Sequence, residues 1–253
     1  MSDPYTVLLY YKYVRIDDPA GFTAEHKAFC ERLNLKGRII IAAEGINGTV
    51  AGSPCAVAEY EHAMRENPLF ADIEFKRSEG SPDTFPKLSV KCRKEIVSLH
   101  LAQDVHPDTA LNNHLSPEQW KTMLDEKKNE VVLFDVRNRY ESDVGKFQGA
   151  IAPAIENFRE LPAALAEYED LKEKTVLMYC TGGIRCEKAS ALFQREGFKN
   201  VFQLHGGIVS YLEKFPKAHW EGDCFVFDQR MLTPIQEETG KTGACAYSGK
   251  PTS

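Results

Sequence analysis

The stretch Thr175–Leu192, TVLMYCTGGIRCEKASAL, decides the fold of the C-terminal half of the chain. Its first five residues are apolar or β-branched and suit a buried strand, and the residues after Arg185 favour a helix. Cys180 ends the strand-like run, and two consecutive glycines, Gly182 and Gly183, allow a tight turn between the two elements. The stretch therefore predicts a strand, a tight loop and a helix.

This loop places a thiol in a setting that favours its ionised form. Successive backbone N–H groups of the loop can point inward at the sulfur of Cys180, and the N-terminus of the helix adds partial positive charge. A thiol so placed has a pKa of roughly 3.5–7.5 instead of about 8.5. We predict that Cys180 is a nucleophile and that Arg185 fixes the loop and stabilises negative charge. The predicted anion cradle consists of Thr181, Gly182, Gly183 and Ile184. The alternative is a buried cysteine followed by an ordinary glycine-rich turn.

The spacing indicates what the loop can hold. Four residues separate Cys180 from Arg185, one fewer than in the cysteine phosphatases, so the loop closes around something smaller than a phosphate. A cysteine persulfide, in which one extra sulfur carries the charge, fits this description. In this respect the chain resembles the rhodanese domains, whose active loop is Cys-x-x-x-x-Arg.

Length and composition narrow the class of protein. The chain has 253 residues, enough for one or two domains that each bury a core. It contains no apolar run long enough to span a membrane and no signal-peptide pattern. Its seven cysteines are scattered without a disulfide framework, so we expect a cytoplasmic protein in a reducing compartment. The net charge of −6 argues against an extended nucleic-acid surface but leaves room for a local basic face.

Residues 1–99 are predicted to form a ferredoxin-like α+β domain, because strand-like and helix-like segments follow one another as β-α-β-β-α-β. The strands are expected near residues 5–14, 38–43, 48–51, 73–76 and 88–97, and the first helix is expected to end near Gly37. Glu44–Asn47 has the residues of a hairpin turn, although its glycine would also allow close approach of a ligand. The lone His26 falls on the apolar face of the first helix and is interpreted as a packing residue.

A basic row lies near the end of this domain. Lys87, Lys91 and Arg93 alternate with the apolar residues Leu88 and Val90, so a strand here would put the three cations on one face. Such a row can bind RNA by neutralising phosphates, and it can equally be a solvated face. The residues alone leave both interpretations open.

A second domain follows a short connection. Residues 100–115 lack periodicity and contain Pro107, which predicts a linker. Ser116-Pro117 then starts an α/β rhodanese-like domain over residues 116–222, and residues 223–253 form a C-terminal extension. Strands near residues 131, 176 and 201 alternate with helices near residues 156–168 and 187–196, which predicts a parallel sheet. Ligands lie beyond the carboxyl ends of the strands in such sheets, and Cys180 falls at such an end.

Further segments resemble known families. FDVRNRYE, with Asp135, Arg137 and Glu141, and LHGGI at residues 204–208 are similar to parts of a rhodanese domain, which implies that Asp135 and Arg137 support the active loop. The order of GRIIIAAEGINGTVAG, FPKLSVKCRKEIVSL, FDVRNRYE, CTGGIRCEKAS and FVFDQR resembles the bacterial tRNA uridine hydroxylase family over nearly all of residues 5–230. This resemblance implies oxygen-dependent formation of 5-hydroxyuridine at the wobble position of tRNA. It also implies molecular oxygen as co-substrate and Cys180 as the active cysteine, with a persulfide as one of its forms.

Two residues beside the loop have two interpretations each. Cys186 can resolve an oxidised Cys180 by forming a disulfide, or it can pack beneath the loop. Lys188 can attract RNA phosphate, or it can be an ordinary charge on the helix surface.

The residues show no pattern for a resident cofactor or metal. There is no facial triad of ligands, no GxGxxG and no Cys-x-x-Cys pair, and His205 and His219 are isolated. Longer members of the family carry Cys-x-x-Cys pairs near the C-terminus. Here Cys245 lacks a second pair of ligands, so we expect no structural zinc, and weaker tRNA binding if that segment holds tRNA.

Other functions would use the same loop. A sulfurtransferase would move sulfane sulfur from thiosulfate or a sulfur-donor protein through a Cys180 persulfide, but it has no evident need for the N-terminal domain. A sulfur-carrying or RNA-binding adaptor would need no catalysis, and a phosphatase conflicts with the short loop. The expected partner is tRNA, with no membrane association, and the residues give no prediction of the oligomeric state.

Overall fold

The computed structural model describes residues 5–101, 105, 107, 113–127, 129–226, 228 and 232–233, and it divides into two compact units. The first unit is formed by the chain up to Ile96 and the second by the chain from Val97. Among the described residues, no helix is long and apolar enough to cross a membrane.

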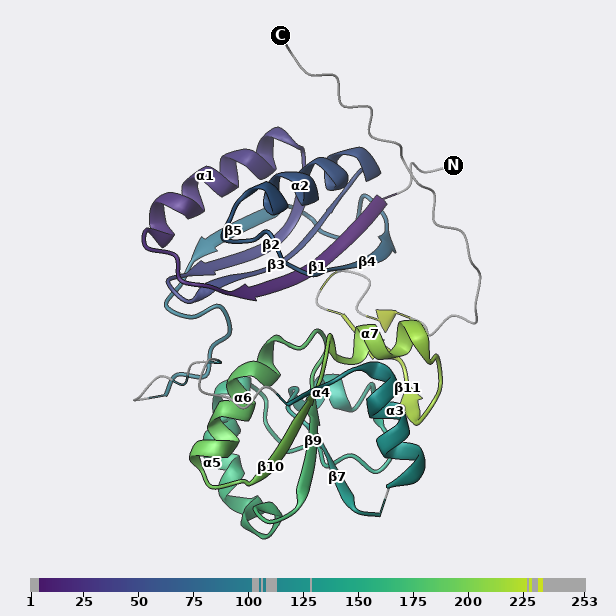
Figure 1. Cartoon of the computed structure of the whole chain (residues 1–253). Helices are drawn as coiled ribbons and strands as arrows, with labels where there is room; N and C mark the ends of the chain where they lie inside the picture. Colours follow the sequence, from purple (N-terminus) through teal and green to yellow (C-terminus); the bar gives the residue numbers. More distant parts are fainter. Residues whose placement is uncertain are drawn as a thin grey trace. The chain divides into compact units, whose positions relative to one another are not determined.

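The first unit is a five-stranded sheet with two helices on one of its faces (Figure 1). Its elements are β1 (Tyr5–Tyr13), α1 (Pro19–Arg32), β2 (Lys36–Ala42), β3 (Gly45–Gly52), α2 (Pro54–Glu66), β4 (Phe75–Gly80) and β5 (Leu88–Cys92). The strand order is β4-β1-β3-β2-β5, with β5 parallel to β2 and the other pairs antiparallel. The predicted ferredoxin-like order of β-α-β-β-α-β is confirmed, and β5 adds an edge strand beside β2.

Local sequence signals start both helices of this unit. Asp18 accepts a hydrogen bond from the N–H of Gly21 ahead of α1, and Ser53 accepts one from the N–H of Ala56 ahead of α2. A proline follows each cap, where its missing N–H costs no helical hydrogen bond. Alternate strand residues then bury one face of the sheet against the helices, and Ile39 is fully buried there.

The hairpin between β2 and β3 turns one residue earlier than the sequence predicts. Ala42 pairs with Gly45, so the turn consists of Ala43 and Glu44, and the rest of the predicted turn belongs to β3. Gly45 has a φ of 142°, and a Cβ atom there would clash with the carbonyl oxygen of Lys12 on β1. The glycine is therefore required by the close approach of a neighbouring strand rather than by the turn itself.

His26 is a packing residue, as predicted. Its side chain is buried under the sheet, and its Nε2 lies 2.9 Å from the hydroxyl oxygen of Tyr60 on α2. Burial lowers the pKa of His26 to about 4, so the ring is neutral in the folded protein near pH 7. Helix α1 itself ends at Arg32, earlier than the expected end near Gly37.

The second unit is built on a four-stranded parallel sheet with the order β6-β10-β9-β7. These strands are β6 (His114–Leu115), β7 (Val131–Asp135), β9 (Thr175–Tyr179) and β10 (Asn200–Leu204), and two short ladders pair β8 (Gly145–Phe147) with β11 (Trp220–Gly222) and β12 (Cys224–Phe225) with β13 (Leu232–Thr233). The helices are α3 (Pro117–Glu126), α4 (Arg139–Ser142), η2 (Phe158–Glu160), α5 (Leu161–Ala164), η3 (Leu165–Leu171), α6 (Ile184–Arg195) and α7 (Gly207–Lys214). The predicted rhodanese-like parallel sheet is confirmed.

Two predictions about this unit differ from the structure. Leu99, at the end of the predicted first domain, and Val105, in the predicted linker, are buried in the core of the second unit. His114–Leu115 of the predicted linker pairs with β10 of the same unit. The helix expected over residues 156–168 is instead a series of short turns, η2, α5 and η3. Pro162 in the first turn of α5 explains the break, because its ring and missing N–H make it a helix start.

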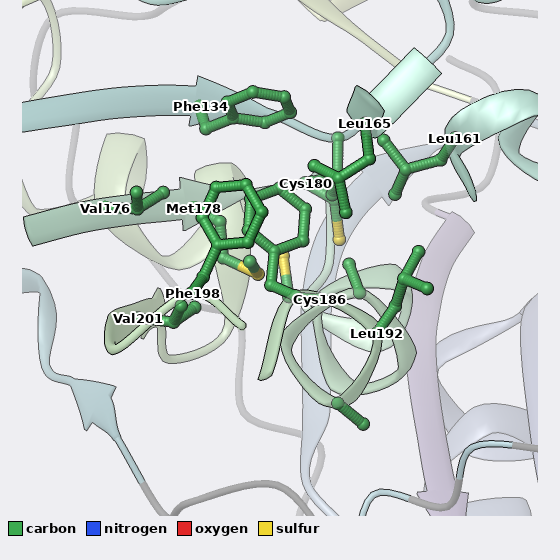
Figure 2. Close-up of a cluster of buried hydrophobic side chains, with 14 of the residues drawn as sticks. Phe134, Leu161, Leu165, Val176, Met178, Cys180, Cys186, Leu192, Phe198 and Val201 are labelled. Carbon is green, nitrogen blue, oxygen red and sulfur yellow. The ribbon is translucent and has the colours of Figure 1, made fainter. Parts of the chain in front are cut away.

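Strand β9 is buried on both faces, which is why it reads as an unbroken apolar run. Val176 and Met178 point into one hydrophobic cluster, with α6 and α5, and Leu177 and Tyr179 point into a second cluster on the other face. Figure 2 shows the first cluster, in which Cys180 and Cys186 lie among the apolar side chains. The loop that begins at Cys180 thus follows a strand that cannot shift without disturbing both clusters.

Candidate active site

Cys180 follows the last residue of β9 and is fully buried at the start of the loop. Gly183 has a φ of 104°, which a side chain rarely adopts, and this conformation turns its N–H toward the sulfur. That N–H donates a hydrogen bond to Cys180 Sγ at 3.2 Å. Helix α6 begins at the next residue, so the positive end of its dipole lies beside the same atom.

The surroundings of Cys180 favour the thiolate. Burial alone would raise its pKa, but the Cys186 thiol, the charge of Arg185 and the N–H groups of these two residues outweigh burial and bring the pKa to about 6. Cys180 is therefore mostly ionised near neutral pH. A buried thiolate held by several donors is a suitable nucleophile.

Cys186 has the opposite character. Burial raises its pKa well above the usual value, and the hydrogen bond and charge of Cys180 raise it further. It therefore stays protonated and donates its S–H to the Cys180 thiolate. Cys186 packs beneath the loop, as one of its two interpretations predicts, and as a donor it also stabilises the Cys180 thiolate. Its role as a resolving cysteine stays a prediction.

Arg185 is held by a partner far away in the chain. Its Nη1 and Nη2 donate to the two carboxylate oxygens of Glu141 at 2.6 and 2.7 Å, and Nη2 also lies 3.2 Å from the hydroxyl oxygen of Thr181. Both charged side chains are buried. Glu141 in turn accepts a hydrogen bond from the N–H of Asn138 at 3.1 Å. This two-pronged ion pair fixes the guanidinium in one orientation next to the loop.

Sequence reasoning noted Glu141 but assigned it no role. Its only local signal is its position six residues after Asp135, within FDVRNRYE. The pairing with Arg185 depends on α4 lying against the loop, which no periodicity reveals.

Asp135 and Arg137 form a second buried ion pair at the end of β7. The guanidinium donates to both carboxylate oxygens of Asp135, at 2.7 Å in the shortest case, and to the carbonyl oxygen of Gly145 at 2.6 Å. Ser142 donates to the same carboxylate at 2.9 Å. Arg137 also lies 5.8 Å from the ring centre of Tyr179, the residue before Cys180. The pair therefore lies where it can support the strand end that carries the loop.

The segment after β10 closes the loop from the other side. The N–H groups of Ile208 and Val209 donate to the carbonyl oxygens of Cys180 and Thr181 at 3.0 and 3.1 Å. A Cβ atom on Gly207 would lie 2.6 Å from each of these two oxygens, so only glycine fits there. The LHGGI segment was noted from the sequence, but this contact with the active loop was not predicted.

The remaining cradle residues take different places. Gly182 is buried within the loop, Thr181 directs its hydroxyl to the ion pair, and Ile184 is the first residue of α6. Of the predicted four, Gly183 is the residue with a described N–H bond to the sulfur.

The prediction that Lys188 lies on the surface is wrong. Lys188 is only 1% exposed, because α6 is enclosed on nearly all sides and the consecutive residues Lys188–Phe193 are all buried. An ammonium group in this position is not on the surface where it would meet an RNA phosphate. Neither surface role considered for Lys188 fits the structure.

The basic row of the first unit lies around β5. Lys91 is in the strand, Lys87 lies just before it and Arg93 just after it, and all three side chains are exposed. The apolar neighbours Leu88 and Val90 pack toward the helices, so the predicted alternation is confirmed.

Among the described residues, no group of three or more His, Cys, Asp or Glu side chains is placed to hold a metal ion. Cys245 lies outside the described residues, as does most of the predicted C-terminal extension.

The parallel sheet and the loop between Cys180 and Arg185 define a rhodanese-like domain in which the pKa of the loop cysteine is lowered. Residues 116–214 match the model of the rhodanese-like domain, and residues 5–96 match that of the UPF0176 acylphosphatase like domain. The rhodanese-like domain of the Alr3790 protein from Anabaena sp. is 22% identical with a TM-score of 0.37, and the match covers 56% of this chain and 99% of that domain.

Similarity to named relatives extends over both units. The tRNA uridine(34) hydroxylase of Shouchella clausii (strain KSM-K16) is 48% identical over 258 residues, which cover 99% of this chain and 79% of that protein. The tRNA uridine(34) hydroxylase of Bacillus pumilus (strain SAFR-032) is 46% identical over 256 residues with the same coverage. The chain belongs to the tRNA uridine(34) hydroxylase family.

Proposed function

We propose that this protein hydroxylates uridine 34 of tRNA, with molecular oxygen as co-substrate and Cys180 as the active cysteine. The observation that carries the proposal is the match to tRNA uridine(34) hydroxylases over 99% of the chain, including the first unit, which sulfur transfer to a small molecule does not need. The reaction would take place in the cytoplasm.

The site supports a nucleophilic role for Cys180. With a pKa of about 6, its sulfur is ionised near pH 7, and the Gly183 N–H already binds it. Arg185 adds positive charge beside the thiolate while Glu141 holds it in place. Asp135 and Arg137 act as positioning residues for the strand end. These groups prepare a reactive sulfur at the carboxyl edge of the sheet.

The first unit would bind the tRNA. Lys87, Lys91 and Arg93 are exposed around one edge strand, and each can neutralise a backbone phosphate. Because such contacts release counterions, tRNA binding should weaken steeply with salt.

A second function shares the same loop. Its short spacing from Cys180 to Arg185 suits a persulfide, so sulfur transfer from thiosulfate or a sulfur-donor protein remains the alternative. A persulfide on Cys180 is also compatible with the hydroxylase function.

The deciding experiment is nucleoside mass spectrometry of tRNA from cells that lack this protein and any redundant pathway. We expect 5-hydroxyuridine to be absent and to return with the wild type but not with Cys180→Ser. Cys55→Ser is the matched control, because Cys55 is exposed on α2 and far from the loop in sequence, and it should restore the nucleoside fully. Unchanged 5-hydroxyuridine without the protein would refute the hydroxylase function. Thiosulfate-dependent sulfur transfer lost in Cys180→Ser would then support the alternative.

A further inference from the structure

One face of the first unit's sheet is not covered by α1 or α2, and we call it the helix-free face. The strand pairing shows which residues lie on the helix-free face. Two residues paired across neighbouring strands point to the same side of the sheet, and successive residues along one strand point to opposite sides. The central positions of the helix-free face are Leu9, Tyr11 and Tyr13 of β1, Asn47 and Thr49 of β3, Arg38 and Ile40 of β2, Lys76 of β4 and Lys91 of β5.

The charged residues that the strands themselves place on this face are all basic, while the exposed Glu74, just before β4, alternates onto the same side. Arg38, Lys76 and Lys91 come from three different strands, and Lys87 and Arg93 flank β5. The five strands of this unit contain a single acidic residue, Glu79. Its neighbour Arg77 forms an ion pair with Glu61 of α2, which places both Arg77 and Glu79 on the opposite, helix-covered side. The helix-free face is therefore complementary to a polyanion, although the whole chain carries a net charge of −6.

Two aromatic side chains lie among these cations. The ring centres of Tyr11 and Tyr13 are 6.3 Å apart with planes at 74°, and both residues are half-buried. Lys76 Nζ lies 5.4 Å from the centre of the Tyr11 ring. Aromatic rings on a flat sheet surface can stack on unpaired bases, while nearby cations bind the phosphates between those bases.

The ends of the face are occupied by the unit's own residues. Phe85 packs against Val7 and Ala51 at one end, and the carbonyl oxygen of Ile96 accepts a hydrogen bond from the Asn47 amide toward the other. What lies between these ends is a strip a few residues long across the sheet. A strip of this kind suits a short single-stranded segment better than a rigid duplex, whose bases are not available for stacking.

We infer that the helix-free face is a platform for an unpaired loop of tRNA, whose bases stack on Tyr11 and Tyr13 while Arg38, Lys76 and Lys91 bind its phosphates. The inference rests on the proposed function, since it assumes that tRNA is the substrate. It adds a recognition mode, stacking on unpaired bases, and residues that the basic row alone did not include.

The test measures binding of the full-length protein to a labelled RNA hairpin with the sequence of a tRNA anticodon arm. A blunt RNA duplex of equal length is the second probe, and fluorescence anisotropy over a salt series is the measurement. Tyr11→Leu/Tyr13→Leu should weaken hairpin binding about tenfold or more without changing the salt dependence. Lys91→Gln should lower the slope of log K against log salt by about 0.7, as expected for one lost phosphate contact to a single strand.

A matched control lies on the helix-covered side of the same unit. Lys27→Gln removes an exposed cation of α1 and should bind the hairpin like the wild type. Thermal melting shows whether the tyrosine variant is folded. As a measurement independent of that variant, 2-aminopurine placed in the hairpin loop should lose fluorescence when it stacks on the wild-type protein.

Two results would overturn the inference. One is hairpin binding by folded Tyr11→Leu/Tyr13→Leu and by Lys91→Gln that equals the wild type, with no quenching of 2-aminopurine. The other is a duplex that binds as tightly as the hairpin and responds to the same substitutions. The proposed function has its own readout: wild-type protein that binds the loop as described but forms no 5-hydroxyuridine would refute the function and leave the platform standing.

Discussion

Replacing Cys186 by alanine tests whether this buried thiol keeps Cys180 ionised. After burial, which opposes ionisation, the hydrogen bond from the Cys186 side chain is the largest influence on the pKa of Cys180. The substitution removes that donor and leaves Arg185 and the backbone N–H groups in place. Cys186 can donate this hydrogen bond only while its thiol is protonated, and its raised pKa keeps it protonated.

The expected size of the effect follows from the energy of a hydrogen bond to a charged group. Such a bond contributes about 1.5–3 kcal/mol, and one pKa unit corresponds to roughly 1.4 kcal/mol. Cys186→Ala should therefore raise the pKa of Cys180 from about 6 to between roughly 7 and 8. At pH 7 the ionised fraction would fall from about 90% to between about 50% and 10%.

Thiolate absorbance in the far ultraviolet measures this shift without requiring a reagent to reach the buried sulfur. Each variant is titrated against the same variant carrying Cys180→Ser, and the difference reports Cys180 alone. Cys186→Ser keeps a hydrogen-bond donor and should titrate close to the wild type. A Cys186→Ala profile that coincides with the wild type, or lies below it in pKa, would refute the idea that Cys186 stabilises the thiolate.

Three further predictions follow from buried contacts. Glu141→Ala leaves the buried Arg185 guanidinium without its carboxylate and should destabilise the second unit by about 3–5 kcal/mol in urea denaturation; a loss below about 1 kcal/mol would contradict the described pairing. Gly207→Ala should displace the active loop and raise the pKa of Cys180 in the same absorbance titration. The control Gly149→Ala, with a φ of 77° and open space around it, should leave that titration unchanged. His26 has a pKa lowered to about 4, so unfolding takes up a proton below pH of about 6.5, and the first unit should lose about 3 kcal/mol between pH 7 and 4. His26→Gln should remove that loss in urea denaturation at the two pH values, and a slope equal to the wild type would exclude His26 as its source.

Much of the active loop could be predicted from the sequence because its parts are neighbours in the chain. The strand before Cys180, the glycine that turns an N–H toward its sulfur and the helix that starts beside it all lie within a few residues. The apolar run of β9 predicted a buried strand, and the structure buries it on both faces. The Ser116-Pro117 pair predicted the start of α3. In each case the signal and the structure it specifies are local.

Other features were decided by tertiary packing. Arg185 pairs with Glu141, which is 44 residues away, and Gly207 is required because its segment crosses directly over the loop. Lys188 looked like a surface residue on a helix, yet its helix is enclosed on nearly all sides. Helical spacing shows which residues share a face but not what covers that face.

The helix-free face combines a feature that the sequence predicts with one that only the fold decides. The alternation of residues along β5 is visible in the sequence and places Lys91 on the other face of the strand from Leu88 and Val90. Its association with Tyr11, Arg38 and Lys76 arises only because the sheet places β5 beside β2 and β4 beside β1, in a fixed register. Strand order and register depend on contacts between distant segments. The sequence by itself therefore determined the elements and the reactive loop, and only the assembled sheet and core determined which residues act together.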